Sequence, residues 1–308
     1  MIVAVTGGSG FIGQRLVAQH LARGDSVRVL SRKERVEGCE GAKLYRGDLG
    51  DAATQLEPFA EGADVLYHCA GEIREPGRMR PLHVEGSARL LHCARGRIGR
   101  WVQLSSVGAY GLRRAGEITE ATPLEPAGTY ERTRAESDRL VEGSGLPYSI
   151  LRPAIVFGAG MPNQSLYQMI AMIDRGLFCF IGRKGASANY VHVNNVAHAL
   201  TLCAGKPGAL GRVYNLSDHC SMERFVALIA GALGKPEPRL RLPEVLLRAC
   251  ARVLGRLPGF PLTPARVDAL TNRSIYPITR IREELGYSHR VSMQQGIEEL
   301  VTAWKSAR

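Results

Sequence analysis

The sequence predicts an α/β fold, with a doubly wound parallel sheet followed by a smaller, mostly helical C-terminal lobe. Three observations support this prediction. An apolar run at residues 1–5 leads through a glycine-rich turn into a helical pattern. Apolar strand-like runs then alternate with helical segments up to about residue 156, as in a parallel sheet. Beyond that residue, the segments are mainly helical and are separated by prolines. A chain of 308 residues is long enough to form a hydrophobic core in a main domain and in a smaller lobe.

The turn after the first strand reads TGGSGFIG at residues 6–13. Gly7 permits a tight turn, Gly10 lets the backbone approach a pyrophosphate, and Gly13 lets the following helix pack on the strand. The helix N-terminus offers unpaired N–H groups and the positive end of a dipole to phosphates. Because the glycines follow a strand and open a helix, they predict a Rossmann-type dinucleotide site that includes Phe11 and Ile12. The alternative is a tight turn that binds nothing.

The other elements are expected in a regular order. Strands are expected at residues 26–30, 42–46, 63–71, 101–104, 148–151, 190–193 and 213–216, and helices at 52–60, 79–95, 129–142, 166–175, 195–204, 222–233, 245–254, 264–270 and 293–304. Residues 1–156 are expected to form the dinucleotide-binding domain, with 190–216 returning to its sheet. Residues 157–189 and 217–308 are expected to form the substrate-binding lobe, and the cleft should lie between the two parts.

The end of the second strand indicates which dinucleotide binds. NAD sites place an acidic residue about 20 residues after the glycines, where it contacts the ribose hydroxyls. Here Ser31 is followed by Arg32 and Lys33. A carboxylate repels a 2′-phosphate, whereas an arginine can bind one through two hydrogen bonds. We therefore expect NADP rather than NAD, the alternative being a solvated basic loop. The fourth strand ends in small residues that let a cofactor lie close: Cys69, Ala70 and Gly71.

The composition, with 45% hydrophobic and 22% charged residues, is that of an ordinary soluble globular protein. The net charge of +11 is spread along the chain, which favours a solvated surface, then anionic substrates, and argues against nucleic-acid binding. Seven cysteines without CxxC spacing predict reduced thiols, and the histidines lack metal-ligand spacing. The first strand starts at Met1 and no run approaches the ~20 apolar residues of a membrane span.

We therefore expect a cytoplasmic protein without stable membrane insertion and without a metal. Residues 245–254 are apolar enough to raise the question of contact with a membrane surface, but a helix facing the core is the preferred interpretation.

Further motifs complete the pattern along the chain. They are Asp48-Leu49, Ser106 followed by Tyr110-Gly111, Tyr130-Glu131-Arg132-Thr133-Arg134, Leu151-Arg152-Pro153 with Phe157-Gly158, Tyr190-Val191-His192-Val193 and Glu284-Leu285-Gly286-Tyr287. Together with TGGSGFIG, their order resembles the extended short-chain dehydrogenase/reductases, which include the NAD(P)-dependent sugar-nucleotide epimerases and dehydratases. The resemblance covers essentially the whole chain. It implies further cofactor contacts from Asp48, Leu49 and Pro153, and homodimers are common among such proteins.

In that family the tyrosine of a YxxxK motif is the general acid/base, a serine or threonine holds the substrate oxygen, and the lysine contacts the nicotinamide ribose. Carried over by position, these roles fall to Tyr130, Ser106 and Arg134. Hydride transfer at a carbinol or keto carbon needs a proton moved at its oxygen, which a phenol beside a cation can do. Arg134 departs from the motif, because a guanidinium keeps the positive charge but cannot release a proton to a relay. His83 stands where asparagine is common in the family.

The substrate is the least defined part of the prediction. Tyr110, Glu72 and Arg266 are candidate substrate contacts, although each can also be explained by packing or solvation. The resemblance favours a nucleotide sugar, but Ala188-Asn189 stand where the family places a second nucleotide-binding arginine. One alternative is an NADPH-dependent reductase of a hydrophobic or steroid-like carbonyl compound. Another is a non-catalytic NADP(H)-binding protein, because Arg134 replaces the lysine.

Overall fold

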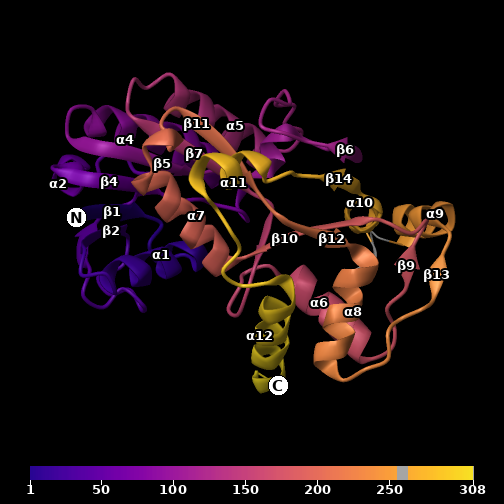
Figure 1. Ribbon diagram of the computed structural model, residues 1–308. Helices are drawn as coiled ribbons and strands as arrows, with labels where there is room; N and C mark the ends of the chain where they lie inside the picture. Colours follow the sequence, from indigo (N-terminus) through magenta and orange to yellow (C-terminus); the bar gives the residue numbers. More distant parts are fainter. Residues whose placement is uncertain (255–262, 308) are drawn as a thin grey trace.

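The structure, a computed structural model, describes residues 1–254 and 263–307. A seven-stranded sheet in the order β11-β7-β5-β4-β1-β2-β3 forms its main body (Figure 1). The strands are β1 (Ile2–Thr6), β2 (Ser26–Ser31), β3 (Lys43–Arg46), β4 (Ala63–His68), β5 (Ile98–Leu104), β7 (Tyr148–Pro153) and β11 (Arg212–Leu216). Every neighbouring pair is parallel. The chain runs outward from β1 to β3 and then returns to build the other half from β4, so the fold is doubly wound, as predicted.

Helices cover both faces of this sheet and fix the two main cores. One face carries α1 (Phe11–Leu21), α7 (Val193–Gly205) and α11 (Thr279–Leu285), and the other carries α2 (Glu57–Ala60), α4 (Ser87–Ala94) and α5 (Thr129–Glu142). Along β1, Val3 and Val5 join the first core while Ala4 joins the second. Successive side chains of a strand point to opposite faces, so a continuous apolar run suits a sheet buried on both sides.

Two of the expected helices differ from the prediction. The one expected at 52–60 shortens to α2. The one expected at 79–95 divides into α3 (Pro76–Arg80), a π-helical stretch η1 (Pro81–Gly86) and α4. Pro81 has no N–H to donate within a helix. A Cβ at Gly86 would lie 2.4 Å from the carbonyl oxygen of Leu49, so the chain here is shaped by close packing that local propensity does not encode.

The second part of the molecule combines small sheets with helices (Figure 1). Its strands are β8 (Ile155–Phe157), β10 (Ser187–His192) and β12 (Asp218–Ser221) in one sheet, β9 (Phe180–Ile181) with β13 (Arg241–Leu242), and β6 (Ala115–Glu117) with β14 (Arg273–Ile275). Its helices are α6 (Gln164–Asp174), α8 (Met222–Leu233), α9 (Glu244–Leu254), α10 (Pro264–Thr271) and α12 (Met293–Ser306). The described residues also contain two 3-10 turns, η2 (Val107–Tyr110) and η3 (Pro207–Ala209).

The segment 190–216 returns to the large sheet only in part. Its last strand, β11, pairs with β7 at the edge of that sheet. The strand expected at 190–193 instead belongs to β10, which pairs with β8 and β12. The stack of Tyr190 on Phe225, with ring centroids 4.3 Å apart, helps hold β10 in the core of the small lobe. Within residues 1–254 and 263–307, none of the helices combines the length and the apolar character needed to cross a bilayer.

Candidate active site

The carboxyl ends of the parallel strands lie along one edge of the sheet, and the residues predicted from the sequence gather there. The turn at 6–13 follows β1, Ser31 ends β2, Asp48 follows β3, and Ser106 follows β5. Cys69, Ala70 and Gly71 follow β4, and Pro153 ends β7. The chain reverses its winding direction between β1 and β4, and ligands of doubly wound sheets bind at such a point.

The three glycines of the turn differ in how much space surrounds them. Gly7 has φ of +68°, and a Cβ there would lie 2.6 Å from the amide nitrogen of Ala70. A Cβ at Gly13 would lie 2.1 Å from the carbonyl oxygen of Gly7. At Gly10, by contrast, the one neighbour within 4 Å is that same oxygen, at 3.2 Å. Gly7 and Gly13 are therefore required by the fold itself, whereas the bare Gly10 opens the N-terminus of α1 to a ligand.

Beyond the carboxyl ends of β2 and β3, two cations lie near one carboxylate. Arg32 Nη1 lies 3.8 Å and Arg78 Nη2 lies 3.4 Å from Asp48 Oδ2. The hydroxyl of buried Ser31 accepts a hydrogen bond from the amide of Lys33 (3.0 Å), which shapes the turn that presents Arg32. The Arg32 side chain is 61% exposed, so it is not committed to Asp48 and can turn toward a phosphate.

The small residues after β4 are hydrogen-bonded to the end of β1. The amide of Cys69 donates to the carbonyl of Thr6 (3.1 Å), and the amide of Ala70 donates to Thr6 Oγ1 (3.3 Å). Thr6 Oγ1 in turn lies 2.7 Å from His68 Nδ1. Burial, with a smaller effect of Arg134, lowers the pKa of His68 to about 3, so this imidazole is neutral and serves as a fixed structural link.

Tyr130 and Arg134 lie one turn apart on α5 and face each other. The Arg134 Cζ is 5.6 Å from the centroid of the Tyr130 ring, which is cation–π distance. Arg134 is 4% exposed, Nη1 donates to the carbonyl of Leu104 (3.3 Å), and Nε has no partner within the part of the chain that the structure describes. A Cβ at Gly71 would lie 1.9 Å from Nη2. A buried guanidinium with a free donor beside the open end of β4 fits a ligand that brings hydroxyl groups.

His83 fixes the loop after β4 against α5. The amide of Glu72 donates to His83 Nε2 (2.8 Å), so the ring proton lies on Nδ1 and is donated to Thr133 Oγ1 (2.8 Å). Burial first, and then Arg134, lowers the pKa of His83 to about 2, which keeps the ring neutral. The Glu72 carboxylate accepts hydrogen bonds from the amides of the next three residues, which lowers its pKa. Glu72 thus shapes this loop.

Ser106 precedes the turn η2 and Tyr110 is its last residue, and α5 packs against this turn. Ser106 Oγ accepts from the amide of Gly108 (3.1 Å), which leaves the Ser106 hydroxyl proton free to be donated. Tyr110 is fully buried; its hydroxyl donates to Asn215 Oδ1 (2.8 Å) and accepts from Arg152 (3.1 Å). The expectation that Tyr110 contacts the substrate is therefore corrected, because its polar atom is enclosed in a structural network.

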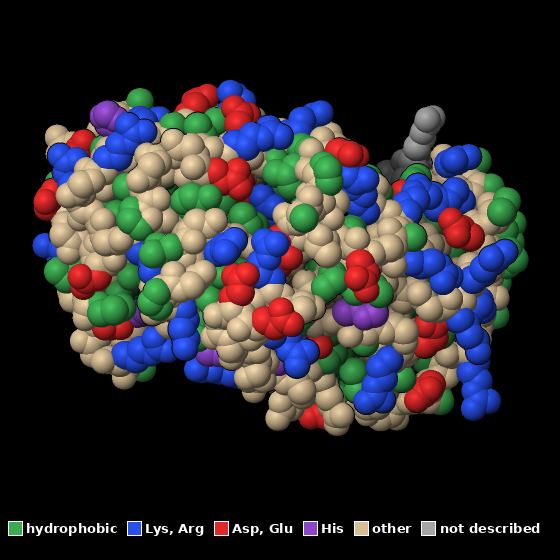
Figure 2. All heavy atoms as spheres, turned by 45° about the horizontal axis from the view of Figure 1, so that its top comes forward, with side chains coloured by type: hydrophobic (Ala, Val, Ile, Leu, Met, Phe, Trp, Pro, Cys, Tyr) green, Lys and Arg blue, Asp and Glu red, His purple; other side chains and the backbone are tan. Residues whose placement is uncertain are grey.

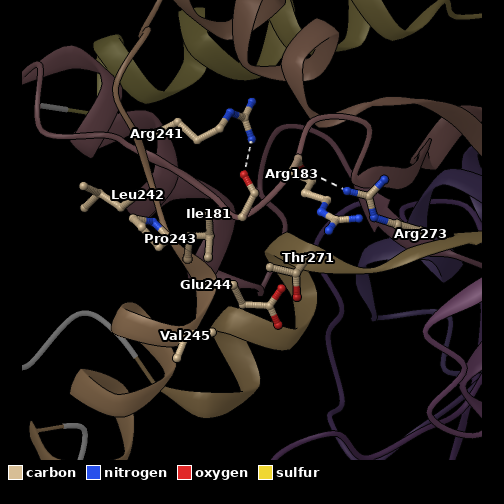
Figure 3. A pocket seen from close by; sticks show the side chains of 10 residues that line it. Ile181, Arg183, Arg241, Leu242, Pro243, Glu244, Val245, Thr271 and Arg273 are labelled. Carbon is tan, nitrogen blue, oxygen red and sulfur yellow. Dashed lines mark hydrogen bonds between the residues drawn. The ribbon is translucent and has the colours of Figure 1, made fainter.

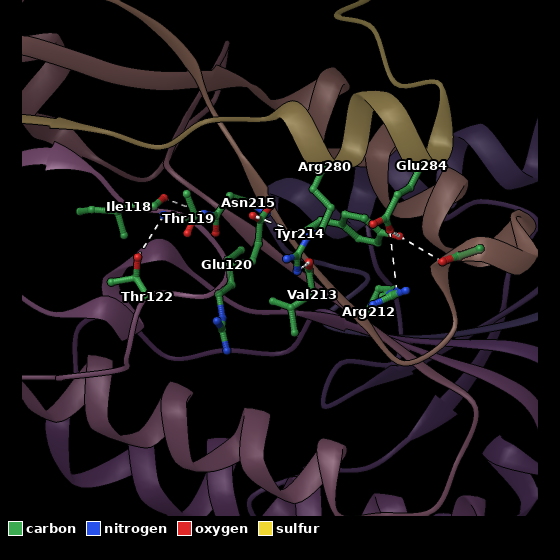
Figure 4. A network of polar contacts seen from close by, with 12 residues as sticks. Ile118, Thr119, Glu120, Thr122, Arg212, Val213, Tyr214, Asn215, Arg280 and Glu284 are labelled. Carbon is green, nitrogen blue, oxygen red and sulfur yellow. Dashed lines mark hydrogen bonds and ion pairs between the residues drawn. The ribbon is translucent and has the colours of Figure 1, made fainter.

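That network contains a buried ion pair that the sequence analysis missed. Arg152 Nε and Nη2 lie 3.0 and 2.9 Å from Asp138 Oδ2, which also accepts from Ser105 Oγ (2.8 Å). Beyond Tyr110, Asn215 Nδ2 donates to the carbonyl of Ile118 (3.0 Å) (Figure 4). The backbone N–H of Asn215 donates to a Glu120 carboxylate oxygen (2.9 Å). The pair ties α5 to β7 directly behind the predicted catalytic residues.

A cavity of about 360 Å³ opens beside Val107, the residue after Ser106. Most of its lining is apolar or aromatic and comes from the small lobe. Arg266 also lines it, and Arg266 Nη2 donates to the Gln168 side chain. Its apolar and aromatic lining includes Val107, Ile155, Met169, Met172, Phe178, Tyr190, Met222, Leu247, Leu270 and Tyr276, and its polar lining consists of Ser165, Gln168, Ser187, Asn189, Arg266 and Asn272. Of the residues that line the cavity, Arg266 was predicted from the sequence as a substrate contact. The others come from several helices, strands and loops and share no local pattern along the chain.

Comparison of the sequence with known proteins identifies its family. The NAD dependent epimerase/dehydratase family matches residues 3–217. A 4-hydroxy-2-methyl-3-oxo-4-farnesyl-3,4-dihydroquinoline-1-oxide ketoreductase of Stigmatella aurantiaca is 33% identical, over 96% of this chain and 94% of that protein. Sterol demethylase protein B of Methylococcus capsulatus is 32% identical, over 82% and 80%.

Among solved structures, a UDP-glucose 4-epimerase of Thermotoga maritima, determined with UDP-glucose, has the same fold. It superimposes with a TM-score of 0.76 at 22% identity, over 100% of this chain and 99% of that one. The glycine turn, the strand order and these matches agree with the resemblance seen in the sequence. The chain therefore belongs to the NAD-dependent epimerase/dehydratase family of extended short-chain dehydrogenase/reductases, and it is an enzyme of the oxidoreductase or epimerase type.

Proposed function

We propose that the chain is an NADP(H)-dependent reductase or dehydrogenase acting at the carbonyl or carbinol carbon of an apolar substrate. The observation that carries this proposal is the cavity beside Val107, whose walls are mainly apolar and aromatic. A nucleotide sugar brings two phosphate charges, which need cations or several N–H donors. The cation that lines the cavity, Arg266, is already hydrogen-bonded to Gln168. The ketoreductase from Stigmatella, whose name describes a farnesylated substrate, supports the same substrate class.

The chain's own residues can supply the proton chemistry. The nicotinamide, when bound, provides or accepts the hydride. During reduction Tyr130 donates its phenolic proton to the carbonyl oxygen, and solvent later replaces that proton. Ser106, whose hydroxyl proton is free, donates a hydrogen bond that orients the same oxygen. Arg134 holds positive charge beside the phenol and offers its unpaired donor to a cofactor hydroxyl. On this proposal the arginine keeps the electrostatic part of the lysine's role.

A nucleotide-sugar epimerase is the second candidate, favoured by Arg266 in the cavity and by the shared fold with the Thermotoga epimerase. We expect NADPH oxidation with apolar ketones, and neither NADPH oxidation nor epimerisation of the sugar with UDP- or GDP-sugar substrates. In Arg266→Met, kcat/KM for an apolar ketone should stay within about threefold of wild type, because the substrate contacts are apolar. A nucleotide sugar would instead lose about tenfold or more with the charged contact. Turnover of UDP-sugars, with loss in Arg266→Met, would overturn the proposed substrate class.

The cofactor preference tests the adenosine end separately. Arg32→Asp should weaken NADPH binding by roughly 10- to 100-fold, because a charge-assisted hydrogen bond is worth about 1.5–3 kcal/mol. NADH binding should change little, so the preference should move toward NADH. Fluorescence titration with both dinucleotides measures this. Arg95→Asp is the control, because it changes charge equally at an exposed position after α4, away from the carboxyl edge. Equal loss in both variants would show that Arg32 has no specific role.

A further inference from the structure

Helix α9 lies at the end of the small lobe farthest from the N-terminus of the chain (Figure 1). Val245, Ala249 and Val253 recur at a spacing of four residues and are all exposed, with Val245 at 82% and Val253 at 72%. Leu246, one residue along, is 54% exposed. Residues four apart are neighbours on a helix surface, so these side chains form one continuous apolar stripe. Contiguous apolar stripes on a protein surface mark contact with another apolar phase or partner.

The opposite face of α9 already holds the helix in place. Ala251 is buried in a small core with Ile181 and Val267, and Leu247 lines the 360 Å³ cavity. Arg248 pairs with Glu244 (2.6 Å) and with Asp268 of α10 (2.8 Å). Folding therefore does not require the outer stripe to be apolar. The helix is at once a wall of the substrate cavity and an apolar outer surface.

Cations line a second cleft at the Val245 end of the stripe, together with Glu244. This cleft, of about 580 Å³, is lined by Val245 together with Arg183, Arg241 and Arg273 (Figure 3). Arg241 is neutralised by Glu223 (2.6 Å), but Arg183 is exposed and pairs with no carboxylate among residues 1–254 and 263–307. Further exposed cations lie nearby: Lys184 and Arg239 line the adjoining cleft that shares Arg241, and Arg252 is on α9. Figure 2 shows Lys and Arg side chains beside hydrophobic ones at this end of the molecule.

We propose that this α9 face, made of Val245, Leu246, Ala249, Val253, Arg183, Lys184, Arg239 and Arg252, docks on the surface of an anionic lipid bilayer. A helix with an apolar stripe and flanking cations lies in the headgroup region, with its apolar side chains inserted and its cations near the lipid phosphates. The link to catalysis rests on the proposed function: an apolar substrate dissolves in the bilayer, and the docked α9 brings the cavity next to it. The docking itself does not depend on the substrate.

Co-sedimentation with phospholipid vesicles tests the proposal without any substrate. Wild type should bind vesicles of phosphatidylcholine mixed with phosphatidylglycerol, more weakly at high salt, and bind pure phosphatidylcholine poorly. The double variant Val245→Ser/Val253→Ser should weaken binding by about tenfold or more. Arg183→Gln should weaken it by about fivefold, the effect of one cation at an anionic surface. Leu210→Ser, which removes an exposed leucine elsewhere (44% exposed), is the control and should bind as wild type does.

Four results would overturn the proposal. The first is failure of the folded wild type to bind anionic vesicles at low ionic strength. The second is unchanged binding by the double variant. The third is displacement by inorganic phosphate beyond that by chloride of equal ionic strength, which would make the cleft a phosphate site. The fourth is a wild-type dimer that the double variant converts to monomer, which would assign the stripe to a second copy of the chain. NADPH oxidation of a water-soluble ketone should be equal in all variants, so failure of docking is distinguishable from failure of the proposed function.

Discussion

Replacing Tyr130 with phenylalanine is expected to lower kcat for ketone reduction by about 100- to 10,000-fold, the range that general acid/base groups contribute. The substitution removes one oxygen atom and keeps the ring, which packs between Arg134 and His83. The centroids of the Tyr130 and His83 rings are 5.8 Å apart. The affinity for NADPH should therefore stay within about twofold of wild type. Stopped-flow NADPH oxidation gives the rate, and fluorescence titration gives the affinity.

The matched control is Tyr148→Phe. Tyr148 is at the amino end of β7, whereas the site lies at the carboxyl ends of the strands. This control should retain wild-type turnover, since it loses the same atom without touching the cleft. Turnover that persists in Tyr130→Phe would exclude the phenol as the proton carrier. If both Tyr130→Phe and the wild type bind NADPH but reduce no ketone or sugar nucleotide, the non-catalytic interpretation raised by Arg134 would be the better one.

The fold could be predicted because its main determinants are local. Val3, Ala4 and Val5 form an apolar run that suits only a strand buried on both faces, and Gly7 and Gly13 stand where a Cβ would strike backbone atoms. The partner of each strand is not local information. The strand at 190–193 resembles those of the large sheet in composition, yet β10 pairs with β8 and β12, because its aromatic residues pack among the helices of the small lobe.

The site could be predicted where spacing along one element determines position. Tyr130 and Arg134 are four residues apart on α5, so a helix alone brings them together. Tyr110 was wrongly expected at the substrate, because only the fold shows that its hydroxyl meets Asn215 from a strand more than a hundred residues later. The buried Arg152–Asp138 pair was not predicted, because charged residues are usually exposed. One feature of the sequence indicated it. Arg134 and Asp138 are four residues apart and lie on the face of α5 that packs on the sheet, where helices normally carry apolar residues.

The buried pair gives the second large prediction. Arg152 and Asp138 are 3% and 1% exposed, and removing one member of such a pair leaves an uncompensated charge in the interior. Asp138→Asn is expected to lower the free energy of unfolding by about 3–5 kcal/mol, measured by urea denaturation. The arginine left behind stays protonated at every accessible pH, so this site should add no pH dependence to the stability of Asp138→Asn. Asp138→Leu combined with Arg152→Met should recover most of it, because an apolar pair leaves no buried charge.

Arg152→Met should behave differently with pH, and this difference is the sharper test. Burial raises the pKa of Asp138, and in the native protein the Arg152 guanidinium opposes that rise. Without the guanidinium, the native carboxyl keeps its proton at pH values where the unfolded chain has already released it. The unfolded state then binds fewer protons, so stability falls as pH rises above the ordinary carboxyl pKa, by up to about 1.4 kcal/mol per unit, until the native carboxyl also ionises. Arg152→Met should thus approach wild-type stability at pH 5 and lose most at pH 8. Parallel pH profiles for Arg152→Met and Asp138→Asn would mean that no buried carboxylate depends on Arg152.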